Sequence, residues 1–535
     1  MNKAGNFVNT YIDTRGFTQS PLTFTEAIIK GIATGGGLFV PQVIPQLTLD
    51  EITALGTLKY AARAATIYKQ FGVDLPFVTI DNLMEQAYGD NFDTPEIAPI
   101  KEVAPNTYVL ELWHGPTSAF KDMALQCLPV FFSAAIEQIR AQSSKGLQSE
   151  QAADIDSLQI SEDFLILVAT SGDTGKAALE GFKDRAFTNI IVFYPHEGVS
   201  DIQYRQMATQ RGDNVGVVGV LGNFDDCQTA VKAAFNDDSF NRELALSHNL
   251  RLSSANSINW GRLMPQITYY VSAYAQLVNR GALRAGDEFD ICVPTGNFGN
   301  ILAAYYASKM GVPIGQLYCA SNENRVLTDF INTGIYDIAN REFKVTPSPS
   351  MDILVSSNLE RQLFELSGRD AKAIRTWMDD LNTKRRFQID RDTFAALREN
   401  YSADWVSSDE SLETIKEVFE SFGYLIDPHT AVAWKVAERL RGLNPVLVVS
   451  TAHWAKFGAD VYRALYGLSA GSKLPDAVFG LSDIELNRRL IKECGAGTIP
   501  TPLAEIDSLP VRFTQRCEGT SDGVKSAVFN WLGLH

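Results

Sequence analysis

The stretch FLILVATSGDTGKAA, Phe164–Ala178, contains an apolar run, a polar loop and the start of a helical segment. The apolar run ends at Ala169 and includes β-branched side chains, which is typical of a strand buried on both faces of a sheet. The glycines and hydroxyl residues that follow end the strand, and the residues from Thr174 onward favour a helix. A strand, a loop and a helix in this order form the repeating unit of an α/β fold.

The same unit recurs further along the chain. Apolar runs of strand length occur at IIVFYP (190–195), VGVVGV (215–220), FDICVP (289–294), IGQLYCAS (314–321) and PVLVVS (445–450). Such runs, alternating with helices, predict parallel sheets covered by helices on both faces, which is the doubly wound α/β class. Because ligands of these sheets bind at the carboxyl ends of the strands, we expect the functional residues in the loops that follow the strands.

Three stretches of the chain differ in their sequence pattern. Residues 1–100 mix short helical patterns with glycine turns and predict a small N-terminal α+β domain. Residues 101–345 carry the strand–helix alternation, and a polar interval at 141–163 without an apolar stripe predicts an exposed insertion. Residues 346–535 are helix-rich and contribute one late strand, so we expect this region to return a loop to the same site.

The composition excludes several classes of function. The chain has 535 residues, of which 45% are hydrophobic, and a net charge of −16. Nucleic acids and anionic membranes both favour a basic surface, so we expect neither as a partner. The start lacks an apolar leader, no run reaches the ~18 residues of a membrane span, and six cysteines are scattered without paired spacing. We therefore expect a cytoplasmic protein with reduced core thiols.

The loop at 169–178 has two interpretations. It resembles a nucleotide-binding P-loop superficially, but it lacks the glycine and the hydroxyl residue that this pattern requires at two positions. Its free backbone N–H groups could bind a carboxylate or a phosphate at the helix end. Alternatively, Ser171, Asp173 and Thr174 only cap the helix, and the loop taken alone favours this simpler interpretation.

The loop PTGNFGN, Pro294–Asn300, follows another predicted strand. Its two glycines let the backbone approach an anion closely, and Asn297 and Asn300 add amide donors where a helix begins. A bare turn would need fewer donors. We therefore interpret this loop as a phosphate-binding loop.

Lys121 lies in HGPTSAFKDMAL (114–125), in the first turn of a predicted helix, where the helix dipole makes a cation slightly unfavourable. Thr451 follows the last predicted strand, and its hydroxyl could bond a ring nitrogen or cap a helix. A lysine, a phosphate loop and such a hydroxyl together describe a site for pyridoxal 5′-phosphate. No histidine pair has metal-ligand spacing, so we expect no metal, and His114 is expected to stabilise the lysine loop.

Five motifs resemble, in order, those of the threonine synthase family: HGPTSAFKDMAL, ATSGDTGKAA, NSINWGR, PTGNFGN and STAHWAKF. FTEAIIKGIATGGGLFVPQ (24–42) is similar to the amino-terminal domain of that family, and SGDTGK resembles its longer bacterial and fungal branch. The resemblance implies the fold type II architecture of the tryptophan synthase β-subunit group. It also implies conversion of O-phospho-L-homoserine and water to L-threonine and phosphate, the last step of threonine biosynthesis, by a monomer or a homodimer.

The resemblance further implies a role for each matching residue. Lys121 would form the Schiff base with the cofactor and move protons during the reaction. The cofactor would be bound by Gly296, Asn297, Phe298 and Asn300 at its phosphate and by Thr451 at its pyridine nitrogen. The substrate phosphate would be bound by Asn256, Ser257 and Arg262. The substrate carboxylate or the 3′-oxygen of the cofactor would be bound by Ser171, Asp173 and Thr174.

Asp173 departs from another branch of the family, which has asparagine at this position. A carboxylate beside a phenolate oxygen is unfavourable unless one of the two holds a proton. Two alternatives to threonine synthesis also stay open. A serine or threonine dehydratase of the same fold would need no second phosphate site, and a non-catalytic homologue would act only as a binding module.

Overall fold

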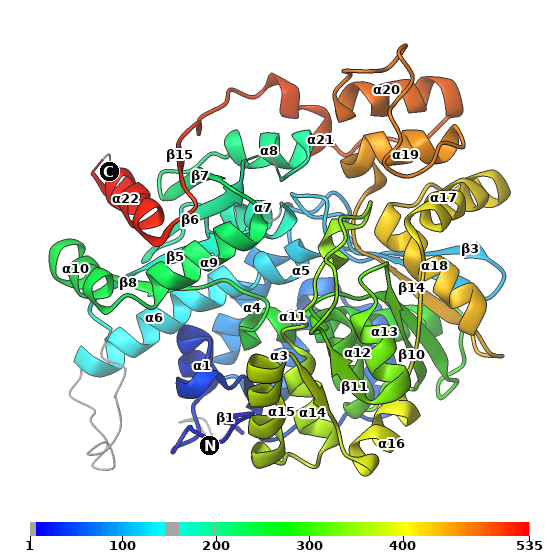
Figure 1. Ribbon diagram of the computed structural model, residues 1–535. Coiled ribbons are helices and arrows are strands. Elements are labelled where there is room, and N and C mark those ends of the chain that lie inside the picture. Colours follow the sequence, from blue (N-terminus) through cyan, green and yellow to red (C-terminus); the bar gives the residue numbers. More distant parts are fainter. Residues whose placement is uncertain (1–6, 145–159, 171, 197, 534–535) are drawn as a thin grey trace.

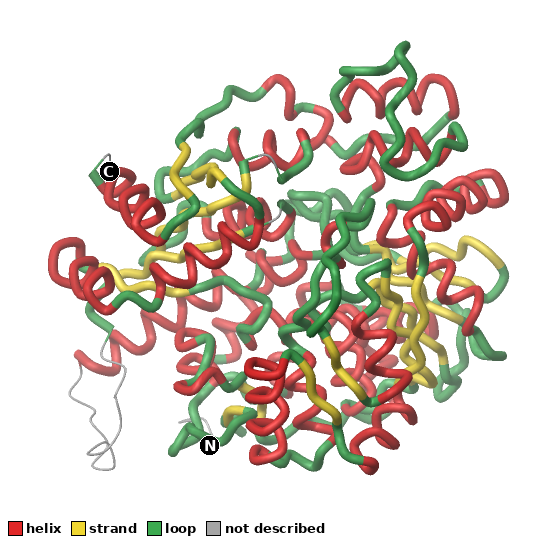
Figure 2. The backbone as a smooth tube through the Cα atoms, viewed as in Figure 1, coloured by secondary structure: helices red, strands yellow, loops and turns green. Residues whose placement is uncertain are grey.

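The computed structural model describes residues 7–144, 160–170, 172–196 and 198–533 (Figure 1). Its strands form two large sheets and two antiparallel pairs of short strands, and the large sheets occupy different parts of the molecule (Figure 2). Ser171 and most of the polar interval at 141–163 lie outside the described residues. No helix within the described ranges is long and apolar enough to cross a membrane.

The larger sheet has six strands, in the spatial order β13, β10, β9, β14, β4 and β3. Neighbouring strands are parallel except for β3 and β4, which are antiparallel. The strands span Tyr401–Trp405 (β13), Ile314–Ser321 (β10), Phe289–Pro294 (β9), Val446–Ser450 (β14), Thr107–Glu111 (β4) and Ile100–Ala104 (β3). A late strand, β14, therefore lies between two early ones.

The second sheet has five strands, all parallel, in the order β15, β7, β6, β5 and β8. The strands span Arg516–Glu518 (β15), Val215–Leu221 (β7), Thr188–Pro195 (β6), Asp163–Ala169 (β5) and Leu250–Ser253 (β8). The strands predicted in the sequence are confirmed in both sheets, with small shifts at their ends. The edge strand β15 comes from the end of the described chain.

Helices cover both faces of each large sheet. In β5, Ile166 belongs to the central buried cluster with α6 (Leu128–Ser144), whereas Leu167 belongs to an outer cluster with α9 (Phe224–Phe235) and α22 (Ser521–Leu532). Because both faces are buried, the strand is apolar at every position from Phe164 to Ala169 instead of alternating. The predicted doubly wound α/β class is confirmed.

The six-stranded sheet is covered in the same way. In β9, Ile291 shares the central cluster with α11 (Trp260–Asn279) and α12 (Gly299–Lys309), and Cys292 shares a second cluster with α18 (Pro428–Leu440). Four of the six cysteines are buried, but Cys494 and Cys517 are only half-buried, so the prediction of core thiols is wrong for these two.

The remaining elements pack around the two sheets. The helices are α1 (Phe24–Lys30), α2 (Leu49–Ala54), α3 (Tyr60–Gln70), α4 (Phe77–Ala87), α8 (Asp201–Ala208), α10 (Asp238–His248), α13 (Val326–Thr333), α14 (Leu359–Leu366), α15 (Ala371–Lys384), α16 (Arg391–Asn400), α17 (Ser408–Phe422), α19 (Gly458–Leu465), α20 (Asp483–Cys494) and α21 (Thr501–Ala504). The short strands are β1 (Tyr11–Asp13) with β2 (Phe39–Pro41), and β11 (Ile335–Asp337) with β12 (Arg386–Gln388). Helices α1, α3 and α4 share the central hydrophobic cluster with α11. The domain limits at residues 100 and 345 stay predictions.

Helix α5 (Lys121–Leu125) begins with the lysine singled out in the sequence and rests on α7 (Asp173–Phe182). The contact is closest at Gly181, where an added Cβ would lie 1.8 Å from the carbonyl oxygen of Leu125. Only a residue without a side chain allows this approach. The contact therefore sets the distance between the lysine helix and the helix that follows the SGDTG loop.

We expect Gly181→Ala to lower the free energy of unfolding by ~1–3 kcal/mol, because the new methyl group would collide with backbone that cannot move aside easily. Helix propensity alone predicts the opposite sign, since alanine is favoured over glycine inside a helix. Thermal denaturation measures the difference. Gly442→Ala, where an added Cβ meets no atom within 4 Å, is the matched control. A midpoint for Gly181→Ala at or above that of the wild type would contradict this account of the contact.

Candidate functional site

Backbone hydrogen bonds join the lysine loop to the loop after β14. The N–H of Phe120 donates to the carbonyl of Thr451 at 2.8 Å, and the N–H of His453 donates to the carbonyl of Ser118 at 3.2 Å. Two of the loops predicted from the sequence are therefore held side by side, at the carboxyl ends of neighbouring strands β4 and β14. This pairing brings Lys121 to the end of the sheet where ligands bind.

The amine of Lys121 has one hydrogen-bond partner within the described part of the chain, the hydroxyl oxygen of Ser350 at 3.1 Å. Burial lowers the pKa of Lys121 from 10.5 to about 8; the charge of Asp173 opposes this shift, and the charges of Lys456 and Arg262 add to it. An amine with this pKa gains and loses a proton near physiological pH. It can therefore act as a nucleophile or a base.

Asp173 forms a buried ion pair with Lys456. The Nζ of Lys456 lies 2.7 Å from Oδ1 of Asp173, and the two side chains are 0% and 3% exposed. Lys456 also donates to the carbonyl of Thr117 at 2.9 Å, and Gln203 donates to Asp173 at 3.2 Å. Burial alone would raise the pKa of Asp173, but the charges of Lys456 and Lys121 hold this pKa well below its usual range. The carboxylate at position 173 thus has its own counter-charge.

At the start of α7, the backbone N–H groups of the SGDTG loop are bonded by the hydroxyl of Thr170 and not by the side chains of Asp173 or Thr174. Gly172 is the N-cap of α7, and the hydroxyl oxygen of Thr170 accepts hydrogen bonds from the N–H groups of Gly172 at 3.0 Å and Gly175 at 2.9 Å. Asp173 uses its side chain for the ion pair, so the capping interpretation is wrong for this residue. Thr174 is half-buried and makes no side-chain hydrogen bond within the described ranges.

The PTGNFGN loop leads into α12 with Phe298 as N-cap in the left-handed region, at φ 61°. The first hydrogen bond inside the helix runs from the N–H of Leu302 to the carbonyl of Phe298, so the N–H groups of the first turn are free of helical partners. The side-chain nitrogen of Asn300 is buried without a partner in the described structure, while its oxygen accepts from two tyrosine hydroxyls. These donors suit a phosphate.

A loop before α14 covers this glycine loop. The hydroxyl of Ser356 donates to the carbonyl of Gly296 at 2.7 Å, and a Cβ on Gly296 would lie 2.8 Å from the carbonyl oxygen of Ser350. The side chain of Asn297 is exposed and accepts from the hydroxyl of Ser357 at 3.1 Å. The loop therefore contacts both the PTGNFGN loop and Lys121, although nothing in its sequence had pointed to the site.

Arg262 is a buried cation without a carboxylate partner among the described residues. Its side chain is on α11, the residue is 5% exposed, and its Nη1 donates to the carbonyl of Ala255 at 2.8 Å while its Nε is buried without a partner. Burial lowers the pKa of Arg262 to about 10, so the guanidinium stays charged at neutral pH. A buried charge left this way is costly unless an anion joins it.

Other buried arginines are fully engaged by the protein. Arg63 and Arg361, 8% and 0% exposed, each make three hydrogen bonds through their three guanidinium nitrogens. Arg262 differs from both, although its burial is similar. The contrast makes Arg262 a candidate ligand-binding residue.

The residues beside Arg262 in the sequence are placed differently. Ser257 is half-buried, and its hydroxyl lies 3.3 Å from that of Ser357, which in turn bonds Asn297. This chain of contacts links the NSINWGR loop to the PTGNFGN loop. Asn256 is exposed and makes no side-chain hydrogen bond within the described ranges.

Two histidines near the lysine loop have structural partners. The ring of His114 lies between Asp93 and Glu111, and although burial opposes protonation, these two carboxylates raise the pKa of His114. This agrees with the expected role in stabilising the loop. Burial, together with the charges of His114 and Lys456, lowers the pKa of His453 to about 3, so this ring is neutral at physiological pH.

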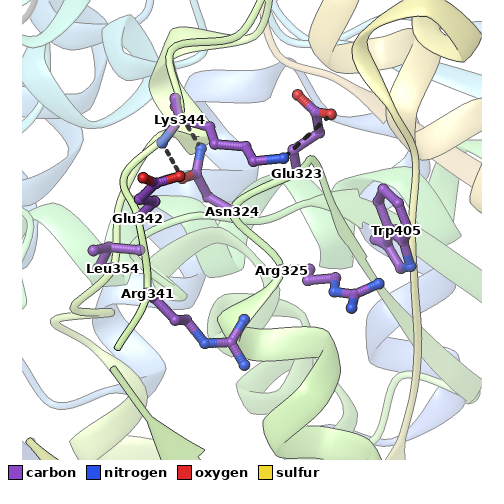
Figure 3. Close-up of a pocket in the computed structure, with 8 residues that line it drawn as sticks. All are labelled: Glu323, Asn324, Arg325, Arg341, Glu342, Lys344, Leu354 and Trp405. Atoms are coloured by element: carbon purple, nitrogen blue, oxygen red, sulfur yellow. Dashed lines mark hydrogen bonds and ion pairs between the residues drawn. The ribbon is translucent and has the colours of Figure 1, made fainter. Parts of the chain in front are cut away.

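A surface pocket of about 320 Å³ lies beyond the carboxyl end of β10 (Figure 3). The lining residues are Glu323, Asn324, Arg325, Arg341, Glu342, Lys344, Leu354 and Trp405. Its cations are engaged: Lys344 pairs with Glu323 at 3.8 Å, and Arg325 and Arg341 both pair with Asp329, at 3.7 and 2.5 Å. Because each of these cations already pairs with a carboxylate, we assign no ligand to this pocket.

Comparison with known proteins identifies the family. The family models "Threonine synthase N terminus" and "Threonine synthase, C-terminal" match residues 10–88 and 430–527. The threonine synthase of Pseudomonas aeruginosa is 39% identical over 469 residues, which are 87% of this chain and 92% of that protein. The chain belongs to the threonine synthase family.

Other members of the family match in different ways. "Threonine synthase-like 1" of Homo sapiens is 43% identical over 451 residues, which are 83% of this chain, but the chain spans only 58% of the length of that relative. A crystal structure of PLP-bound threonine synthase from Brucella melitensis is 35% identical, covers 98% of this chain and 99% of its own, and superposes with a TM-score of 0.82. The fold type II architecture implied by the motifs is confirmed.

The lowered pKa of Lys121 predicts its chemical reactivity. In protein freed of bound aldehydes, we expect labelling of Lys121 by an amine reagent to rise with pH with a midpoint of about 8, because only the neutral amine reacts. Peptide mass spectrometry across a pH series gives the midpoint, with the exposed lysines of the same chain as internal standards. A midpoint for Lys121 near the ordinary lysine pKa of 10.5 would contradict this account of the charges around the amine.

The buried ion pair predicts a double-mutant cycle. Asp173→Asn leaves the ammonium of Lys456 buried without its counter-charge and should lower the free energy of unfolding by ~3–5 kcal/mol, whereas adding Lys456→Met should restore much of the loss. The exposed pair of Lys473 and Asp476, 67% and 95% exposed, is the matched control and should show less than ~1 kcal/mol of coupling. Equal coupling in the two cycles, measured by denaturation, would refute the importance of the buried pair.

Proposed function

We propose that this chain is a pyridoxal 5′-phosphate enzyme that converts O-phospho-L-homoserine and water into L-threonine and phosphate. The observation that carries the proposal is Arg262, a buried guanidinium that lacks a counter-anion within the described residues and lies near enough to Lys121 to lower its pKa. Membership of the threonine synthase family supports the same reaction. The cytoplasmic location expected from the sequence is part of this proposal.

The described residues fit the cofactor. Lys121 offers an amine of lowered pKa for covalent attachment, and the first turn of α12 with the unpartnered amide of Asn300 offers donors for a phosphate. Thr451 is 5% exposed, and its hydroxyl makes no hydrogen bond within the described ranges, so it is available for a ring nitrogen. The Brucella melitensis relative was solved with PLP bound.

The ion pair of Asp173 and Lys456 explains how a carboxylate can lie beside the phenolate oxygen of the cofactor. A lone carboxylate at position 173 would repel the phenolate oxygen of the cofactor. With Lys456 at 2.7 Å, the pair is neutral overall, and both members are fixed by further hydrogen bonds. The chain can therefore use aspartate here without placing an uncompensated negative charge in the cofactor site.

The chemistry needs an electron acceptor and a mobile proton. The bound cofactor supplies the acceptor, a conjugated ring that takes up the electron pair left when the substrate loses its Cα proton. Lys121, with a pKa of about 8, can take protons from Cα and Cβ and return both, one at Cγ after phosphate has left and one at Cα after the hydroxyl group has added at Cβ. Arg262 binds the substrate phosphate and retains it after cleavage, where it is available as a base for the water that adds at Cβ.

Two other functions are less well supported. A serine or threonine dehydratase has no substrate phosphate to bind, so it would leave Arg262 buried and unneutralised. A non-catalytic homologue would have no need of a lysine with a lowered pKa at the strand ends. Threonine and phosphate formed in equal amounts from O-phospho-L-homoserine support the proposal, and a keto acid as product would support a dehydratase.

Lys121→Ala should abolish formation of both products, because Lys456, the other lysine that the described residues place in these loops, is not free to take its place. Lys456 is fully buried and held by Asp173 and Thr117. The measurement is a product assay on the purified variant in the presence of added cofactor. Normal threonine formation by this variant would reject the assignment of Lys121.

Arg262→Gln should lower kcat/KM for O-phospho-L-homoserine by about 10²-fold or more, because a charge-assisted phosphate contact is lost. The same change should leave the thermal midpoint of the ligand-free protein unchanged or higher, since it removes an unneutralised buried charge. Arg63→Gln is the matched control, because it removes a fully bonded buried arginine and should lower the midpoint without changing KM. Unchanged kinetics for Arg262→Gln would exclude it from the phosphate site.

A further inference from the structure

A continuous set of contacts leads from Lys121 to a buried histidine that the sequence left without a role. The amine of Lys121 donates to the hydroxyl oxygen of Ser350 at 3.1 Å. The backbone N–H of Ser350 donates to Nε2 of His429 at 3.1 Å, and Nδ1 of His429 lies 2.7 Å from a carboxylate oxygen of Asp427. His429 and Asp427 are each 1% exposed.

The two contacts of His429 fix its protonation pattern. Because Nε2 accepts the N–H of Ser350, it carries no proton, and the proton of a neutral ring must be on Nδ1, where it is donated to Asp427. The ring packs against Phe457, with centroids 5.1 Å apart, next to Lys456. Position and tautomer of His429 are therefore both determined by its surroundings.

Asp427 is firmly held in turn. It is the N-cap of α18 and accepts the backbone N–H groups of His429 at 3.0 Å and Thr430 at 3.1 Å. The hydroxyl of Thr430 lies within hydrogen-bond distance of Ser450, the last residue of β14. The support behind His429 thus begins at the sheet that also positions Thr451.

Ser350 lies in a loop with little regular secondary structure, so contacts from outside the loop must hold it in place. It lies in a single 3-10 turn, Pro349–Met351, and its side chain is half-buried. A backbone N–H captured by a rigid imidazole fixes this turn, and with it the direction of the serine hydroxyl. The hydroxyl is the only hydrogen-bond acceptor that the described residues offer to the amine of Lys121.

We propose that His429 is a positioning residue for Lys121, acting through Ser350, and that Asp427 selects the tautomer in which it can do so. The inference rests on the proposed function, in which Lys121 is the reacting amine. When the amine is not bound to the cofactor, its hydrogen bond to Ser350 keeps it in one orientation. In that orientation the amine lies close to the substrate atoms between which it moves protons. A misplacement of a reacting group by about 1 Å can cost ~10²-fold in rate.

Two substitutions of His429 separate its two contacts. The amide oxygen of His429→Gln can replace Nε2 as acceptor for Ser350, whereas the shorter His429→Asn can still donate towards Asp427 but cannot reach Ser350. Ser350→Ala removes the acceptor of the amine directly. His248→Asn changes an exposed histidine remote from the site and is the matched control.

We expect kcat to fall by ~10–100-fold in His429→Asn and Ser350→Ala with KM changed less than about threefold, because neither side chain binds the substrate. His429→Gln should retain kcat within about threefold, and His248→Asn should match the wild type. A loss of kcat in His429→Gln equal to that in His429→Asn, with both proteins folded by circular dichroism, would overturn the proposal. So would normal kcat in Ser350→Ala.

Labelling of Lys121 in the full-length, cofactor-free protein provides a readout that does not depend on turnover. The ammonium form loses its acceptor in His429→Asn and Ser350→Ala, so the labelling midpoint should fall by about half a pH unit to one pH unit, but stay in place in His429→Gln. The charges that face the amine, Asp173, Lys456 and Arg262, are the same in all variants. If the wild type formed no threonine, the proposed function would fail while this comparison would still test the role of His429; unchanged midpoints in all variants would overturn it.

Discussion

The ion pair between Lys456 and Asp173 connects three loops of the candidate site. Asp173 follows β5 of the five-stranded sheet, Lys456 follows β14 of the six-stranded sheet, and the ammonium also bonds Thr117 in the lysine loop. Removing two charges from water costs free energy. A buried ion pair offsets this cost only when the two charges are close together and further hydrogen bonds satisfy their remaining polar atoms. The same contact therefore makes the relative position of the two sheets specific, and it neutralises an anionic side chain beside the proposed cofactor site.

Arg262, unlike Asp173 and Lys456, is a buried charge without a counter-charge among the described residues. Arg63 and Arg361 have every guanidinium nitrogen bonded by the protein. Each cation of the surface pocket pairs with a carboxylate, although Arg325 and Arg341 share that of Asp329. Arg262 has one carbonyl partner and a buried nitrogen without any in the described structure. An anion that binds here would recover the free energy lost in burying this charge, so the proposed phosphate binding would also complete the electrostatics of the fold.

Much of the architecture could be predicted from the sequence because its signals are local. Continuous apolar runs such as Phe164–Ala169 can only be buried on both faces, and glycine-rich loops such as PTGNFGN mark where strands end. Lys456 was visible in a quoted motif, yet only the fold reveals that it faces Asp173. Ser350 carried no signal, because its importance comes from contacts with Lys121 and His429, which are distant in sequence.

The order of strands also affects how the protein can fold while it is being translated. Strand β14 lies between β4 and β9, and β15 pairs with β7 at an edge of the other sheet. Neither large sheet can therefore be completed until a segment from late in the chain has been translated. While the chain is still being made, the emerging amino-terminal portion exposes strand edges that the finished enzyme covers. Nascent chains of this topology must therefore be kept from associating with one another until the last strands arrive.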